Sequence, residues 1–416
     1  MMENVLLVTV GFNSQKQNFR AKDQARELKD LALSTGANII DEVLCSRDKP
    51  TPDLFLGSGK VEEIGDLCTE QKIGTVIFDK NLSGTQQRNL EDSLKIKTID
   101  RTQLILDIFA RHAKTPEGKM QVELAQLQYL LPRLIGKGII LSRLGGGIGT
   151  RGPGEQKLEV DRRRIRGRIV KLKQDLDSII ARRKTMRKKR NESSLPTVAL
   201  VGYTSAGKST LLNSLTGSKQ RVSRYLFTTL DPLSRSIALS NNQKIVLSDT
   251  VGFISDLPAH LIEAFKATLE EVVESDLLIQ VLDISDLRCH EHDKVVRDVL
   301  KKLSIEDKPM VTALNKADLL DDRGWIDRYK SDFPDSVEIS ALNKENFSAL
   351  FRLIERKLET MFVSASLKLP INRMDLVDLI YREGQVKSID YTQDSIKVRV
   401  VLPSITACKL SSYIIT

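Results

Sequence analysis

The sequence predicts a multidomain α/β protein, on three observations. Strand-like and helix-like stretches alternate over residues 1–112 and again over residues 195–362. Residues 113–194 between them carry two stripes of apolar residues at helical spacing, and a short unit, residues 363–416, follows at the end. Alternating strands and helices form mostly parallel sheets with helices on both faces. We therefore expect two α/β domains, a helical pair between them and a small α+β domain.

Residues 1–112 are predicted to form the N-terminal α/β domain. The stretches VLLVTVGF, ANIIDEVLCS, TVIFDKN and KTIDRTQLILDIFARHA contain apolar, partly β-branched runs. KDQARELKDLALSTG and GKVEEIGDLCTEQKIG carry apolar residues at helical spacing and end at glycine, a helix stop signal. The fragment GSGK at residues 57–60 resembles part of a phosphate loop. Leu54 and Val61 stand where that loop needs Gly and Ser or Thr, so we expect no nucleotide there.

Residues 113–194 are predicted to form a long antiparallel two-helix coiled coil joined by a glycine-rich loop. Pro132 predicts that the first helix kinks or ends early. Such a pair buries one apolar seam. The seam residues are Met120, Leu124, Leu127, Leu131 and Leu134 on the first helix and Leu158, Ile165, Ile169, Leu172, Leu176 and Ile179 on the second.

The basic excess of the chain is concentrated in the second of these helices. Residues 161–190 contain 14 Lys or Arg and 3 Asp, whereas the other 386 residues contain 50 basic and 52 acidic residues. Concentrated positive charge is typical of an element that binds a polyanion such as RNA, although a solvated helix face has the same composition. The candidate RNA contacts are Arg151, Arg162, Arg163, Arg164, Arg166 and Arg168.

The loop LGGGIGTRGPGE contains a G-x-G-x-x-G match at residues 147–152 that we do not interpret as a dinucleotide site. Such a site needs a strand before it and free N–H groups after it. Here the preceding sequence is helical in pattern, Pro153 lacks an N–H and Glu155 brings negative charge. Proline and acids favour the first turn of a helix, so a long helix is expected to begin here.

Composition excludes several classes of protein. No apolar run approaches the roughly 18 to 20 residues of a membrane helix, so no membrane span is expected. The cysteines are far apart in the sequence, which argues against a metal site or a disulfide framework and fits a reducing cytoplasm. They are Cys45, Cys68, Cys289 and Cys408. We expect a monomer.

A phosphate loop follows the strand-like run TVALVG. Residues 202–209 read GYTSAGKS and lead into a helical stretch, the context that a P-loop requires. Gly202 and Gly207 let backbone N–H groups point at phosphate oxygens. Lys208 is placed to reach the β- and γ-phosphates, and the Ser209 hydroxyl to bind Mg²⁺. The remaining loop contacts are Tyr203, Thr204, Ser205, Ala206 and Thr210.

A second motif predicts guanine as the base. Residues 315–318 read NKAD after the strand-like run MVTAL. The Asp318 carboxylate can accept hydrogen bonds from N1–H and the 2-amino group of guanine, neither of which adenine offers. The sequence therefore predicts GTP over ATP, with GDP as product. The expected base contacts are Asn315, Lys316, Ala317 and Asp318, with Ser340, Ala341 and Leu342 after the strand SVEIS.

Two switch segments lie between these motifs, and together the four motifs predict a GTPase domain over residues 195–362. Asp249 is placed to hold Mg²⁺ through water and the Gly252 N–H to contact the γ-phosphate, while Thr229, favoured over Thr228, is the second Mg²⁺ ligand. Lys208, Thr229 and Gly252 are the catalytic candidates. The segments comprise Asp249, Thr250, Val251 and Gly252, and Phe227, Thr228, Thr229, Leu230 and Asp231.

Phe253 follows Gly252, at the position where Ras-like GTPases carry the glutamine that orients the attacking water. The phenylalanine side chain cannot form a hydrogen bond to water. We therefore expect slow intrinsic hydrolysis and a partner that completes the catalytic site. Residues 363–416 suggest a strand, a helix and a hairpin without chemistry of their own.

The chain resembles the HflX GTPases of the Obg–HflX superfamily over nearly its whole length. The resemblance rests on GGGIGTRGPGEQKLEVDRRRIRGRI, GYTSAGKSTLLNSLTG, LFTTLDPLSR, DTVGFISDLPAHLIEAFKATLEEV and NKADLL. It implies a cytoplasmic GTPase that binds the large ribosomal subunit, splits stalled ribosomes and hydrolyses GTP faster on the ribosome. It also implies that the helical pair and its loop reach ribosomal RNA near the peptidyl-transferase centre. The family loop carries asparagine where this chain has Ser205, which argues against potassium activation.

Two other functions share some of these features. An ATP-driven RNA-remodelling factor would also use a basic helical pair, but Asp318 argues against ATP. A GTP-sensing assembly scaffold for the large subunit would bind GTP without needing turnover.

Overall fold

The computed structural model describes residues 3–12, 17–134, 153–190, 195–217, 226–227, 233–240, 244–320, 322, 324–392 and 394–415. The chain divides into two compact units. The first comprises residues 1–176, 223–231 and 256–266, and the second comprises residues 177–222, 232–255 and 267–416. No helix among these described ranges is long and apolar enough to cross a membrane.

The first unit contains a four-stranded, fully parallel sheet in the order β2-β1-β3-β4. Strand β1 lies inside this sheet, and six of its successive residues are buried, as expected for a strand covered on both faces. The strands are β1 (Asn4–Phe12), β2 (Asn38–Arg47), β3 (Thr75–Phe78) and β4 (Lys97–Ile99), and the helices are α1 (Gln17–Ser34), α2 (Ser58–Glu70), α3 (Gly84–Leu94) and α4 (Arg101–His112).

Two of these elements were not expected from the sequence. The stretch KTIDRTQLILDIFARHA forms only a three-residue strand, β4, and continues as α4. Asp100 causes the change, because its side chain accepts a hydrogen bond from the Gln103 N–H (2.8 Å) and caps the helix. Helix α3 was not predicted. Its signal is a capping box in which the Ser83 and Gln86 side chains each bond the other's backbone N–H.

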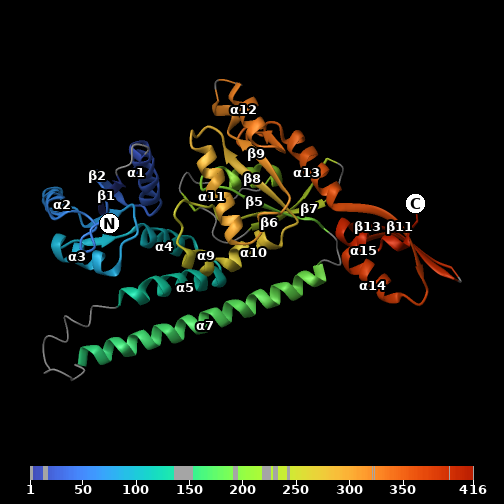
Figure 1. Cartoon of the computed structure of the whole chain (residues 1–416), viewed down its shortest axis with the longest axis horizontal. Helices are drawn as coiled ribbons and strands as arrows, with labels where there is room; N and C mark the ends of the chain where they lie inside the picture. Colours follow the sequence, from blue (N-terminus) through green and yellow to red (C-terminus); the bar gives the residue numbers. More distant parts are fainter. Residues whose placement is uncertain are drawn as a thin grey trace. The chain divides into compact units, whose positions relative to one another are not determined.

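The helical pair consists of α5 (Pro116–Arg133) and α7 (Pro153–Arg190), which run antiparallel (Figure 1). Helix α5 ends one residue after Pro132, as the sequence predicts. Helix α7 begins at Pro153 and continues for 38 residues, which is about 57 Å at about 1.5 Å per residue. Leu172 and Leu176 of its predicted seam are buried. Residues 135–152, which include the glycine-rich loop and Arg151, lie outside the described residues.

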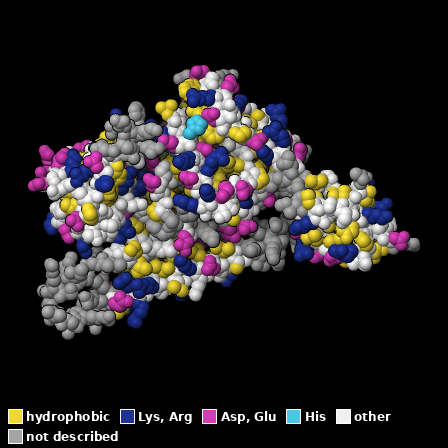
Figure 2. Space-filling view, viewed as in Figure 1, with side chains coloured by type: hydrophobic (Ala, Val, Ile, Leu, Met, Phe, Trp, Pro, Cys, Tyr) yellow, Lys and Arg dark blue, Asp and Glu magenta, His cyan; other side chains and the backbone are white. Residues whose placement is uncertain are grey.

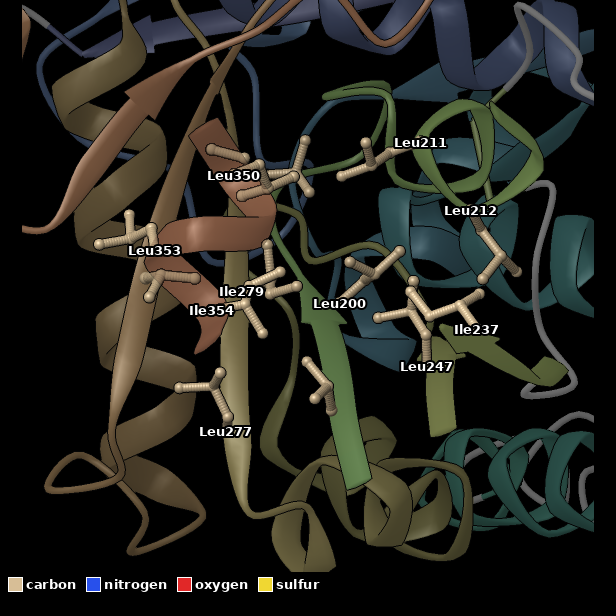
Figure 3. Packing of buried hydrophobic residues seen from close by; sticks show 14 of the residues in the cluster. Leu200, Leu211, Leu212, Ile237, Leu247, Leu277, Ile279, Leu350, Leu353 and Ile354 are labelled. Carbon is tan, nitrogen blue, oxygen red and sulfur yellow. The ribbon is translucent and has the colours of Figure 1, made fainter. Parts of the chain in front are cut away.

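The second unit contains a six-stranded sheet in the order β10-β9-β8-β5-β7-β6, parallel except for β6. Leu200, Leu247 and Ile279 lie in its core, where helices α8 and α13 contribute Leu211 and Ile354 (Figure 3). The strands are β5 (Thr197–Val201), β6 (Leu233–Ala238), β7 (Lys244–Asp249), β8 (Leu277–Asp283), β9 (Met310–Asn315) and β10 (Ser336–Glu338). The helices are α8 (Lys208–Thr216), α10 (Lys266–Glu274), α11 (Cys289–Lys302), α12 (Gly324–Asp332) and α13 (Phe347–Met361), with the short helix η2 (Ala317–Leu319).

Helices cover both faces of this sheet. On the face opposite α8 and α13, Leu282 and Leu314 pack against α11 and α12. The arrangement confirms the predicted fold class, a multidomain α/β chain with a mostly parallel sheet in this part.

The C-terminal part of the second unit is a four-stranded antiparallel sheet in the order β12-β13-β11-β14. It has its own core, which includes Leu367, Ile380 and Val398. The predicted strand, helix and hairpin are β11 (Phe362–Pro370), α14 (Met374–Glu383), and β12 (Gln385–Tyr391) with β13 (Ser395–Pro403). The chain continues through α15 (Ser404–Lys409), η3 (Ser411–Tyr413) and β14 (Ile414–Ile415).

Candidate functional site

The phosphate loop connects the end of β5 to the start of α8. Gly202 has a φ of 155°, and a Cβ there would lie 2.4 Å from the Val281 carbonyl oxygen. Gly207 has a φ of 101°, and a Cβ there would lie 2.3 Å from Asn315 Nδ2. Both positions therefore require glycine. The first turn of α8 follows the loop, so its N–H groups face the loop interior, where an anion binds well.

Lys208 is buried beneath this loop. Its Nζ donates hydrogen bonds to the carbonyl oxygens of Gly202 (3.1 Å) and Tyr203 (2.8 Å). An ammonium group has three N–H donors, so one remains for a ligand in the loop. Burial lowers the pKa of Lys208 to about 8, and the Asp249 carboxylate opposes this shift. A bound phosphate would raise this pKa again by supplying a second negative charge.

Ser209 and Asp249 bring two oxygen ligands together at the start of α8 and the end of β7. The Ser209 Oγ donates a hydrogen bond to Asp249 Oδ2 (2.7 Å), and Asp249 is fully buried. The neighbouring Thr250 points the other way, because its Oγ1 donates to the Leu200 carbonyl oxygen (2.5 Å). A hydroxyl and a carboxylate in contact fit Mg²⁺, which prefers oxygen ligands. The Thr250 hydroxyl therefore links the end of β7 to β5 and does not point toward Ser209 and Asp249.

Asn315 joins the phosphate loop to the second base-binding segment. Its Nδ2 donates to the Ala206 carbonyl oxygen (2.8 Å), and its Oδ1 accepts from the Ala341 N–H (2.9 Å). Lys316 has a φ of 64° and forms an ion pair with Asp283. Residues from three distant stretches thus meet at one edge of the sheet. Asp318, at the centre of η2, is exposed and can receive a base.

Gly252 lies against the phosphate loop. A Cβ on Gly252 would be 3.0 Å from Lys208 Nζ and 2.9 Å from Thr204 Cγ2, so a side chain there would have to displace these groups. Phe253 beside it is buried, in agreement with a residue that does not orient water. Of the other predicted switch residues, Phe227 is buried with a φ of 58°. Residues 228–231, Thr229 among them, lie outside the described residues.

The candidate RNA contacts that the structure describes lie on the N-terminal half of α7. Arg163, Arg164 and Arg166 are exposed, and Figure 2 shows Lys and Arg side chains on this helix. Arg168 has a structural role as well, since its guanidinium donates to both carboxylate oxygens of Glu123 on α5 (2.6 and 2.8 Å). These bonds lower the pKa of Glu123.

The sequence did not indicate two sets of residues that hold the switch segments. Tyr203 and Ser255 form one set with His292 of α11 in the second unit. In the first unit, Phe109 of α4 packs its ring against Phe227 (4.6 Å between centroids) and Phe265 (4.5 Å). An isolated histidine or phenylalanine gives no sequence signal for such contacts, because they join residues far apart in the chain.

Family models and relatives agree on the class of protein. Models described as GTP-binding GTPase N-terminal, GTP-binding GTPase Middle Region and 50S ribosome-binding GTPase match residues 22–110, 112–190 and 197–316. The GTPase HflX of Lacrimispora saccharolytica is 44% identical over 402 residues, which cover 97% of this chain and 94% of the relative. The chain belongs to the HflX family of GTPases. The GTPase HflX of Escherichia coli K12 is 39% identical, over 96% of this chain and 94% of the relative.

Among solved structures, a GTP-binding protein from the hyperthermophilic archaeon Sulfolobus solfataricus in complex with GDP is similar. It is 27% identical with a TM-score of 0.46, over 86% of this chain and 98% of that protein. As an HflX GTPase, the chain is a P-loop enzyme that binds GTP and hydrolyses it to GDP.

Proposed function

We propose that this HflX GTPase acts in the cytoplasm on the large ribosomal subunit, and that GTP binding and hydrolysis control its association with the ribosome and the splitting or rescue of ribosomes. The helical pair and the glycine-rich loop contact ribosomal RNA. The observation that carries the proposal is that the chain combines a basic surface on α7 with a complete set of GTPase motifs. The name of the matching family model, 50S ribosome-binding GTPase, supports the same partner.

The geometry of α7 suits RNA phosphates. The side chains of Arg164 and Arg166 are 78% and 54% exposed, and their nearest acidic neighbours lie 3.9 and 4.0 Å away, at the limit of an ion pair. Exposed guanidinium groups that are only weakly paired can exchange their acidic partners for RNA phosphates with little loss of free energy. The bidentate bond between Arg168 and Glu123 meanwhile holds α7 on α5.

Nucleotide binding follows from the site described above. The backbone of residues 202–208 surrounds the phosphates, Lys208 neutralises the β- and γ-phosphates, and Asp318 binds guanine. Ser209, Thr229 and Asp249 would hold Mg²⁺, which would neutralise charge on the phosphates. The Gly252 N–H binds the γ-phosphate. Because Phe253 cannot orient water, the ribosome completes the catalytic site.

We infer a route from the switch segments to the helical pair through residues of the first unit. Phe227 stands two residues before the predicted Mg²⁺ ligand Thr229. Phe265 directly follows α9 (Ala259–Ala264), which comes after Gly252 in the chain. Both rings pack on Phe109, and Lys173 of α7 forms an ion pair with Glu263 of α9 (2.9 Å). Movement of either switch on loss of the γ-phosphate would therefore reach α4 and α7 directly.

Binding to purified large subunits tests the proposed partner. The triple variant Arg163→Gln, Arg164→Gln, Arg166→Gln should bind more weakly in co-sedimentation with a non-hydrolysable GTP analogue. The slope of log affinity against log salt should fall by about two to three units, since each lost phosphate contact removes about 0.7 to 0.9. Its affinity for the analogue itself should not change.

A matched control removes three exposed lysines from α11 instead: Lys294→Gln, Lys301→Gln, Lys302→Gln. The control should keep both the affinity and the salt slope of the unmodified protein. Equal losses in the two triple variants would mean that net charge, and not the α7 surface, governs binding. Unchanged binding of the α7 variant would contradict the proposed RNA contact.

A further inference from the structure

Tyr203 belongs to the phosphate loop, but its side chain packs against α11. The ring is stacked on that of His292, with 3.9 Å between centroids and 13° between planes. Both residues are buried, at 7% exposure each. Helix α11 stands outside the nucleotide motifs and is 14 residues long, so it is a rigid support. The stack fixes the plane of the tyrosine ring and with it the direction of the hydroxyl group.

The Tyr203 hydroxyl is bonded to the segment that follows Gly252. Its oxygen lies 2.8 Å from Ser255 Oγ and accepts a hydrogen bond from the Ser255 N–H (3.1 Å). A hydroxyl can donate one hydrogen bond and accept others, so the Tyr203 hydroxyl can bond both the backbone N–H and the side chain of Ser255. Ser255 is three residues beyond Gly252, and its position constrains that of the glycine.

The main chain adds two bonds between the same segments. The Thr204 N–H donates to the Phe253 carbonyl oxygen (2.8 Å), and the Phe253 N–H donates to the Gly202 carbonyl oxygen (3.1 Å). Residues 253–255 are thus attached to residues 202–204 at both the backbone and the side-chain level. Gly252 stands directly before this attachment and lies against Thr204 and Lys208.

We infer that Tyr203, Ser255 and His292 are positioning residues that hold the Gly252 N–H at the γ-phosphate end of the site. The inference rests on the nucleotide site proposed above. Because GDP has no γ-phosphate for Gly252 to bind, the contribution of these three residues is specific to the triphosphate. They therefore set how strongly the protein prefers GTP to GDP.

The affinities of the full-length protein for GDP and for a non-hydrolysable GTP analogue, measured by calorimetry with Mg²⁺, test this inference. Tyr203→Phe keeps the ring and its stack on His292 but removes the hydroxyl. Loss of its bonds should weaken analogue binding about three- to tenfold and change GDP binding less than about twofold. Ser255→Ala removes only the bond of Ser255 Oγ and keeps its N–H donor, so it should have a smaller effect in the same direction. The double variant should be no weaker than Tyr203→Phe, since that variant already removes both bonds.

His292→Leu keeps the packed volume but not the stacking, and should shift the same ratio of affinities in the same direction. Tyr381→Phe, at an exposed tyrosine of α14, is the matched control and should leave both affinities unchanged. Equal weakening of GDP and analogue, additive losses in the double variant, or an unchanged ratio would overturn the inference. If the unmodified protein bound neither nucleotide, the proposed site itself would be wrong.

Discussion

Replacing Lys208 with alanine should lower the rate of GTP hydrolysis by about 100- to 1,000-fold at saturating large subunits, the loss typical of removing one group that stabilises transition-state charge. Lys208 Nζ lies between the loop carbonyls and Gly252. In the proposed site, negative charge grows there on the γ-phosphate during hydrolysis. Single-turnover hydrolysis measured by phosphate release gives this rate directly.

The loss should not come from unfolding. Burial lowers the pKa of Lys208 to about 8, well below the ordinary value for lysine, so its charged form is less stable in the folded chain than in the unfolded chain. At about pH 7 the buried charge of Lys208 therefore lowers the free energy of unfolding, and alanine removes this destabilisation. The nucleotide-free variant should have a melting temperature no lower than that of the unmodified protein. Lys301→Ala, an exposed site on α11, is the control. Hydrolysis within about twofold of normal in Lys208→Ala would contradict the phosphate-loop assignment.

Replacing Asp318 with asparagine should change the base that the protein accepts. In the proposed site the Asp318 carboxylate accepts two hydrogen bonds from guanine, whereas an amide would repel one of those donors with its own N–H groups. A site that hydrogen-bonds a group of its ligand loses much of its affinity when either partner of that bond is replaced. We expect the affinity for GTP to fall by about 1,000-fold. Xanthosine triphosphate, which carries an oxygen in place of the 2-amino group, should bind better than GTP.

Competition against a fluorescent nucleotide measures these affinities. Asp298→Asn, at an exposed aspartate of α11, should leave the preference for GTP unchanged. Retained GTP preference in Asp318→Asn would show that another residue reads the base. Competition by ATP as strong as by GTP in the unmodified protein would favour the RNA-remodelling alternative.

The predictable parts of the site are those in which one local motif specifies one backbone geometry. Gly202 and Gly207 are needed because their φ angles and close neighbours exclude any side chain, and the G-x-x-x-x-G-K-S pattern reports that requirement. The long helix α7 was predictable for a similar reason, since its apolar spacing and Pro153 at its start are local signals.

Contacts between distant elements were not predictable. The stack of Tyr203 on His292 and the hydrogen bond from the Leu226 N–H to Ser34 Oγ (2.9 Å) depend on how the chain packs, and no short pattern encodes them. The role of Asn315 shows the same limit. Its motif indicated a base contact, but its amide also joins the phosphate loop to Ala341. Local patterns thus predicted the chemical groups of the site, whereas contacts between distant elements depend on how the chain packs.

Ribosome-stimulated catalysis is tested by the rate of GTP hydrolysis with and without purified large ribosomal subunits. Phe253 occupies the position at which Ras-like GTPases carry the residue that orients water, and we propose that α7 contacts ribosomal RNA. We expect slow hydrolysis alone and a stimulation of at least about 100-fold by large subunits. The Arg163, Arg164 and Arg166 triple variant should lose this stimulation while its nucleotide affinity stays the same. Fast hydrolysis without subunits and no change on adding them would contradict the account, and tight binding without stimulation would favour a scaffold that senses GTP.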